Sequence, residues 1–118
     1  MFKKSLILTC ILMQSTAVLA ANCETKREVF IENKTTKVWK TIICPNQKLP
    51  FHTHEFARVV IPKEDGYMEV IYQTGKHEVI TLKKDKPTLL SVQQGRELHQ
   101  DMNIGRKPIE VTVIELRK

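Results

Sequence analysis

The feature that most constrains the fold of this chain is a two-residue period in its apolar residues. Apolar and polar side chains alternate in short runs such as REVFIE, KVWKTII, YMEVIY and PIEVTVIEL, and clusters rich in Gly, Pro, Asn and Asp separate the runs. Such a period places alternate side chains on opposite faces of a β-strand. No segment has the period of an amphipathic helix. Seven or eight short strands, about ten residues apart, predict an all-β fold, either an antiparallel barrel or a sandwich.

The first twenty residues have the pattern of a secretory signal. Lys3 and Lys4 form a positive start, residues 5–13 form an apolar centre, and Val18 and Ala20 provide the small residues of a cleavage site. The apolar centre is shorter than the ~20 residues that a membrane-spanning helix needs. We therefore expect a signal peptide over residues 1–20, no stable membrane span after cleavage, and one exported domain over residues 21–118, periplasmic or secreted.

The charge of the expected mature domain excludes one class of partner. Removal of residues 1–20 leaves 118 − 20 = 98 residues with a net charge of (19 − 2) − 13 = +4. Lysines and acidic residues are interspersed, as in KREVFIENK and LKKDK, and no basic block stands out. Nucleic-acid binding needs a clustered basic patch. We therefore expect a small-molecule or metal partner and no nucleic acid, and both a monomer and a homodimer stay open.

Cysteine usage agrees with export. Cys10 lies in the expected signal peptide, which leaves Cys23 and Cys44 as a pair in the mature chain. An oxidising compartment permits a disulfide between them, and their wide spacing is unlike a redox CxxC motif. The alternative is two unpaired buried thiols.

Two of the four histidines are candidate metal ligands. His52 and His54 are two residues apart, so in a strand both imidazoles project from the same face. His99, in the later segment GRELHQDMN, could add a third nitrogen. Three neutral nitrogens with open coordination positions suit zinc, iron, copper or nickel, and the sequence does not choose among them.

These residues resemble the two sequence motifs of the cupin family, over roughly residues 45–117. The positions that fit the first motif are His52, His54 and Gly66, and those that fit the second are His99 and Asn103, with Gly95 displaced by one residue. The resemblance implies a small double-sheet β-barrel, or jelly roll, with the histidines in its interior. It also makes Asn103 a candidate ligand-binding residue.

The chain departs from the cupin pattern at the motif's glutamate. Counting back from Gly66 places this position at Val59, and strand parity from His54 places it at Arg58. Neither residue is a carboxylate, so a metal would be held by the three histidines alone, or weakly, or not at all. An inward-facing Arg58 would instead favour an anionic ligand such as a carboxylate or phosphate, which makes it a second candidate ligand-binding residue.

Three functions remain compatible with the sequence. No nucleophile motif or phosphate-binding glycine loop is present, so the sequence identifies no catalytic residue and leaves open whether the protein is an enzyme. The first function is a divalent-metal site acting on a small polar molecule. The second is non-catalytic binding of a small anion. The third is a structural secreted β-barrel with a degenerate metal site.

Overall fold

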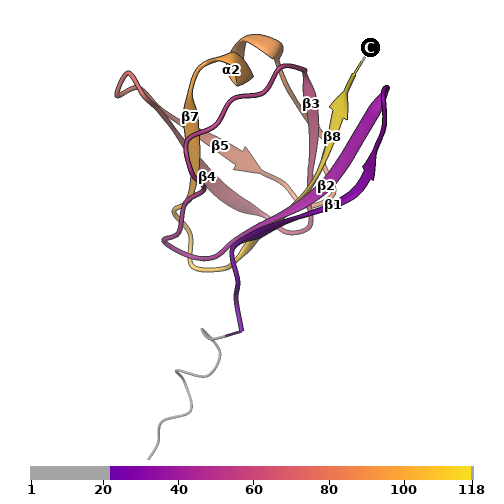
Figure 1. Ribbon diagram of the computed structural model, residues 1–118. Coiled ribbons are helices and arrows are strands. Elements are labelled where there is room, and N and C mark those ends of the chain that lie inside the picture. Colours follow the sequence, from indigo (N-terminus) through magenta and orange to yellow (C-terminus); the bar gives the residue numbers. More distant parts are fainter. Residues whose placement is uncertain (1–21, 118) are drawn as a thin grey trace, which may run out of the picture.

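A computed structural model describes residues 22–117, so the expected signal peptide over residues 1–20 lies outside the described residues. The described residues form eight strands and a short helix, drawn in Figure 1: β1 (Lys26–Glu32), β2 (Thr36–Ile43), β3 (Arg58–Pro62), β4 (Gly66–Tyr72), β5 (His77–Leu82), β6 (Thr88–Leu90), α2 (Val92–Arg96), β7 (His99–Asn103) and β8 (Ile109–Leu116).

The strands form two antiparallel sheets that face each other as a barrel. One sheet has the order β1-β2-β8-β3-β6, and the other has the order β5-β4-β7. This arrangement confirms the predicted all-β, double-sheet jelly roll. In the described part of the chain, no helix is long and apolar enough to cross a membrane.

The two-residue period separates the inner and outer faces of the sheets. Along β3 and β8 the side chains are alternately buried and partly exposed, with Arg58 and Ile109 as the first buried residue of each strand. The inward-facing apolar residues form one core: Trp39, Ile43, Val60, Met68, Val70, Tyr72, Leu82, Ile109, Val111 and Val113. Burial of this apolar surface is the main force that holds the two sheets together.

The hairpin turn between β4 and β5 is built around Gly75. Gly75 has a φ of 95°, which a residue with a Cβ rarely adopts, and its N–H donates to the Tyr72 carbonyl at 2.9 Å. The β1–β2 hairpin turns at Asn33, whose side-chain oxygen accepts the backbone N–H groups of Thr35 and Thr36, both at 2.9 Å. Short side chains that bond to the local backbone are typical of tight turns.

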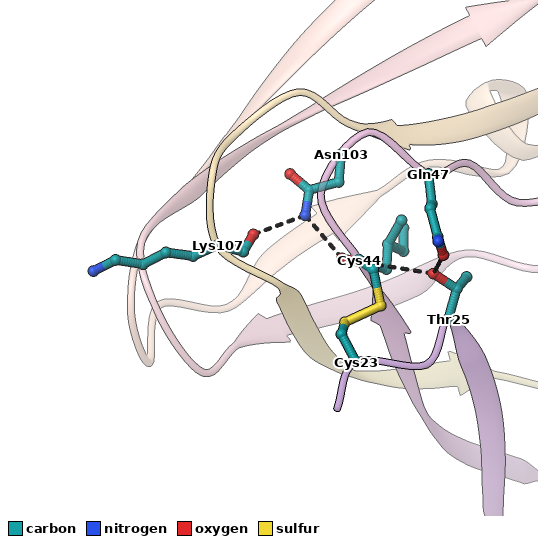
Figure 2. Close-up of a disulfide and its surroundings, with 7 residues drawn as sticks. Cys23, Thr25, Cys44, Gln47, Asn103 and Lys107 are labelled. Carbon is teal, nitrogen blue, oxygen red and sulfur yellow. Dashed lines mark hydrogen bonds between the residues drawn. A yellow bond between two sulfur atoms is a disulfide. The ribbon is translucent and has the colours of Figure 1, made fainter. Parts of the chain in front are cut away.

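The predicted disulfide between Cys23 and Cys44 is present, with a Cα–Cα distance of 5.9 Å (Figure 2). It ties the segment before β1 to the residue after β2. The same junction is held by Thr25, whose hydroxyl oxygen accepts the Cys44 N–H at 2.9 Å and whose hydroxyl also bonds to Gln47. The start of β1 is therefore fixed by covalent and hydrogen bonds.

One end of the barrel carries the polar inward-facing residues. β3 begins there with Arg58 and β8 ends there with Glu115, since these two residues are paired in register. The helix α2 lies across this same end, at the top of Figure 1. Apolar residues fill the interior further down β3 and β8, so the polar end is where a ligand site can form.

Candidate metal centre

His52 and His54 lie in an irregular segment between β2 and β3, and not in the strand that the sequence analysis assumed. The segment is nevertheless extended and tied to its neighbours. The backbones of His52 and His99 exchange two hydrogen bonds of 2.7 and 3.1 Å, and the His54 N–H donates to the Gly95 carbonyl at 2.7 Å. These bonds bring His52 beside β7 and His54 beside α2.

The three predicted histidines converge. One ring nitrogen from each of His52, His54 and His99 lies within 4.8 Å of the other two. Three points with this spacing have a common centre at most about 2.8 Å away (4.8/√3). A metal–nitrogen bond is about 2.0–2.1 Å long, so movements of less than about 1 Å per ring would complete a three-coordinate site.

Backbone carbonyls fix which nitrogen of two of the rings faces the site. Nδ1 of His52 lies 2.7 Å from the Pro50 carbonyl, and Nδ1 of His99 lies 2.6 Å from the Glu97 carbonyl. A carbonyl oxygen only accepts, so each Nδ1 must carry the proton and donate. Nε2 is then the nitrogen with a free lone pair in each neutral ring. Metal-binding histidines in proteins are usually oriented in this way.

Burial keeps two of the imidazoles neutral. It lowers the pKa of His54 to about 3, with the positive charge of Arg58 adding to the effect. Burial also lowers the pKa of His99, although the Glu97 carbonyl and Asp101 oppose the shift. Around His52 the effect of burial is outweighed by Asp101 and by the Pro50 carbonyl, so the pKa of His52 is raised. Neutral rings are the form that binds a metal.

Arg58, and not Val59, points into the barrel. Its side chain is 3% exposed and lines the cavity beside the histidines, while Val59 lies on the outer face of β3. The sequence leaves both residues open, and the burial pattern of β3 places Arg58 on its inner face.

The structure does not bring Asn103 to the histidines, in contrast to the ligand-binding role expected for it. Its side-chain nitrogen donates to the carbonyls of Ile43 and Lys107, both at 2.8 Å, and its oxygen accepts the Gly105 N–H at 2.8 Å. Figure 2 shows the amide beside the disulfide region. Because backbone groups occupy both ends of the amide, the role of Asn103 is to hold the β7–β8 connection.

The histidines line an inner cavity of about 50 Å³ that also includes Arg58, Gln94 and Asp101. An outer pocket of about 290 Å³ borders this cavity. The two share four lining residues: Arg27, Trp39, His52 and His54. His52 and His54 therefore lie between the inner cavity and this outer pocket.

Four residues of this site are not among the candidates named from the sequence: Asp101, Trp39, Arg27 and Gln94. The Asp101 carboxylate lies 3.6 Å from Nε2 of His52. Trp39 is a core residue whose ring also stacks on His54, with centroids 6.2 Å apart and planes 10° from parallel. Arg27 lies over the Trp39 ring, 4.4 Å from its centroid, and Gln94 lines the inner cavity. All residues of β1 are exposed, so strand periodicity carried no signal for Arg27.

Comparisons with known proteins identify the fold. No protein-family model matches the sequence, and no curated protein matches it. Among solved structures, a cupin domain from Bordetella pertussis is similar, with 19% identity, coverage of 80% of this chain and 94% of the other, and a TM-score of 0.70. A cupin family protein with a double-stranded β-helix fold from Methanocaldococcus jannaschii has 12% identity, coverage of 80% and 81%, and a TM-score of 0.63.

A double-stranded β-helix domain protein from Klebsiella pneumoniae is also similar, with 22% identity, coverage of 80% and 78%, and a TM-score of 0.59. At such identities the similarity concerns the fold and not the activity. The chain has the cupin fold, a double-stranded β-helix barrel.

Proposed function

We propose that the protein is a small exported cupin that binds a divalent transition metal through His52, His54 and His99. The observation that carries this proposal is the convergence of three ring nitrogens within 4.8 Å of one another at the polar end of the barrel. The carbonyls of Pro50 and Glu97 fix the orientation of two of the rings, so little rearrangement is needed for binding.

The surrounding residues determine how strongly a metal would bind. The cavity lining carries two guanidinium groups, Arg27 and Arg58, and one carboxylate, Asp101. This balance of charges is less favourable to a bound cation than a glutamate in place of Arg58 would make it. The carboxylate of Asp101 offsets part of the repulsion. The imidazole donor set suits zinc, iron, copper or nickel. A bound ion would supply a Lewis acid with open coordination positions for a small polar molecule.

Metal titration of the purified mature protein tests this proposal. We expect one zinc or nickel ion per chain by calorimetry, with stoichiometry confirmed by elemental analysis. Replacing any one of His52, His54 or His99 by Ala should sharply reduce the occupancy. His77→Ala is the matched control, because His77 is exposed and pairs with Glu69 at 3.0 Å, away from the cluster. Unchanged stoichiometry in all three cluster variants would place the site elsewhere.

Export is the second part of the proposal, supported by the sequence pattern of residues 1–20 and by the disulfide. Expression of the full chain in a Gram-negative host, followed by fractionation and N-terminal sequencing, tests it. We expect a periplasmic or secreted product that begins at Ala21. A cytoplasmic product with an intact N-terminus would contradict export without affecting the metal proposal.

A further inference from the structure

Arg58 is an unusual residue to find in the interior of this barrel. Its side chain is 3% exposed, and its Nε is buried without a hydrogen-bond partner in the described structure. A buried charge is costly unless it is paired, and a buried N–H without a partner adds to that cost. The position therefore needs an explanation that packing alone does not give.

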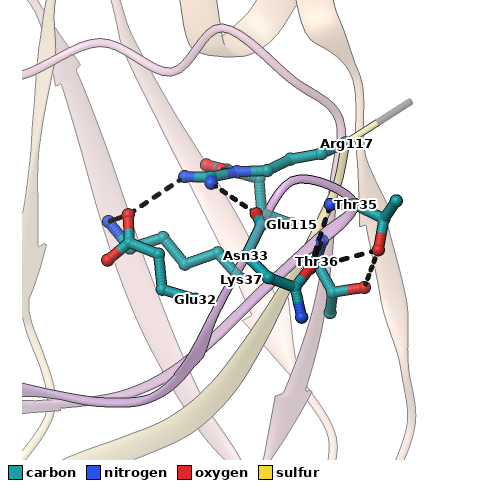
Figure 3. A network of polar contacts seen from close by, with 7 residues as sticks. All are labelled: Glu32, Asn33, Thr35, Thr36, Lys37, Glu115 and Arg117. Atoms are coloured by element: carbon teal, nitrogen blue, oxygen red, sulfur yellow. Dashed lines mark hydrogen bonds and ion pairs between the residues drawn. The ribbon is translucent and has the colours of Figure 1, made fainter.

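No carboxylate of residues 22–117 lies within the 4.0 Å ion-pair distance of this guanidinium. Glu115 is its register partner on β8, but that carboxylate accepts from Nε of Arg117 at 2.6 Å. Figure 3 shows Arg117 linking Glu115 to Glu32 on the β1–β2 hairpin. Asp101 lies beside His52, at 3.6 Å. Asp101 thus faces His52 and Glu115 is paired with Arg117, so neither carboxylate forms an ion pair with Arg58.

The guanidinium is nevertheless held in a fixed orientation. Its Nη2 donates to the side-chain oxygen of Gln94 on α2, and the Gln94 amide nitrogen lies 3.4 Å from the Tyr72 hydroxyl. The Tyr72 hydroxyl in turn donates to Glu78 at 2.7 Å. Gln94 thus positions Arg58 with a neutral group and does not neutralise its charge.

We propose that the inner cavity binds a small carboxylate, with the Arg58 guanidinium as its counterion beside the three histidines. The inference rests on the proposed function, because the carboxylate would enter the same cavity as the metal. Arg58 lines this cavity, and its planar group of N–H donors matches the two oxygens of a carboxylate. The inner volume of about 50 Å³ admits only a small group, and the outer pocket could hold a longer remainder.

Titration of the mature protein with acetate and formate tests the inference, in metal-free form and after zinc loading. Fluorescence of Trp39, the single tryptophan of the chain, reports on binding because its ring lines the cavity. Acetamide is the neutral control ligand. We expect acetate to bind the metal-free protein, acetamide to bind at least about tenfold more weakly, and Arg58→Met to weaken acetate binding by about tenfold or more.

Arg106→Gln, at an exposed arginine, is the matched control variant and should bind acetate as the wild type does. Arg58→Met should also unfold at a temperature equal to or above that of the wild type, because it removes a buried charge with which no carboxylate forms an ion pair. If Arg58→Met does not fold, Arg58→Lys takes its place. Its compact ammonium should still weaken acetate binding several-fold.

Equal affinities for acetate and acetamide, or an acetate affinity that no Arg58 variant changes, would overturn the inference. Zinc titration of the same samples in carboxylate-free buffer separates the two proposals. Zinc binding without acetate binding would overturn the carboxylate site and leave the metal centre. Acetate binding that depends on Arg58, without zinc binding, would overturn the metal centre and support the role of Arg58.

Discussion

Arg58 places a positive charge at an inward position of β3, in the cavity that the histidines line. Its positive charge opposes the binding of a divalent ion in the same cavity. The same charge adds to the larger effect of burial in lowering the pKa of His54. Arg58 therefore makes the cavity less favourable to cations and more favourable to anions than a neutral residue at this position would.

Replacing Arg58 by Glu should raise the affinity for zinc by about tenfold or more, because a repelling charge is exchanged for a metal-binding one. Titration calorimetry on the wild type and on Arg58→Glu measures the change, with circular dichroism as the check on folding. Arg106→Glu makes the same change of charge at an exposed site and should have a much smaller effect. No gain in a folded Arg58→Glu protein would contradict the inward placement of Arg58.

The neutral state of His54 and His99 predicts how stability depends on pH. Both have a folded-state pKa below the ordinary 6.5, so the unfolded chain binds more protons than the folded chain below that pH. The free energy of unfolding of the metal-free protein should therefore fall as the pH decreases from about 6.5 toward about 3. The raised pKa of His52 has the opposite effect on the free energy of unfolding, but His52 is one group, and His54 and His99 are two.

Urea denaturation of the metal-free protein at a series of pH values measures this dependence. His54→Phe keeps an aromatic ring against Trp39 and removes the group with the pKa of about 3, so its stability should fall less steeply below pH 6.5. His77→Ala should follow the wild-type curve. An identical acid dependence in His54→Phe and the wild type would show that His54 is not held neutral in the folded protein.

At the scale of the elements, α2 packs closely against His54 and Arg58 because Gly95 has no side chain. A Cβ at Gly95 would lie 2.9 Å from Cβ of His54 and 3.2 Å from both the His54 carbonyl oxygen and Nη2 of Arg58. The helix can approach this closely only with glycine here. The same approach permits the hydrogen bond from the His54 N–H to the Gly95 carbonyl.

Gly95→Ala should therefore destabilise the protein by about 1–3 kcal/mol, although alanine is the better helix former. It should also weaken metal binding, because His54 must move away from α2. Denaturation curves and zinc titration measure the two effects. Gly66→Ala is the control, since a Cβ there meets its nearest atom at 3.9 Å. Unchanged zinc affinity in Gly95→Ala would show that α2 does not position His54.

At the scale of the whole molecule, β1 is an edge strand whose residues are all exposed and which pairs only with β2. It nevertheless contributes Arg27 to the inner cavity and to the outer pocket. The disulfide at its start and the Arg117 contacts at its end hold it against the barrel (Figures 2 and 3). These two attachments fix the strand that carries Arg27.

Replacing Cys23 and Cys44 together by Ser should lower the free energy of unfolding by about 3 kcal/mol, since the bridge closes a loop over a sequence separation of 21 residues. Urea denaturation with and without reductant measures the loss. Reductant should destabilise the wild type and leave the double variant unchanged. Labelling of both cysteines in the mature protein without reductant would contradict the bridge.

The sequence by itself determined the properties that depend on near neighbours in the chain. The two-residue period of β2, β3, β4 and β8 predicted the all-β fold and the inward face of each strand, because alternation is a local property of extended backbone. The same locality placed His52 and His54 on one side of an extended segment.

The tertiary structure decided which distant residues meet. Sheet order, strand register and the irregular path of residues 44–57 bring Asp101 beside His52 and Arg27 beside Trp39. They also leave Asn103 bonded to backbone groups away from the histidines. Spacing along the chain does not encode these contacts, because turns and loops interrupt the strand period. The residue types of the site could therefore be predicted, whereas the partner of each charge followed from the closure of the barrel.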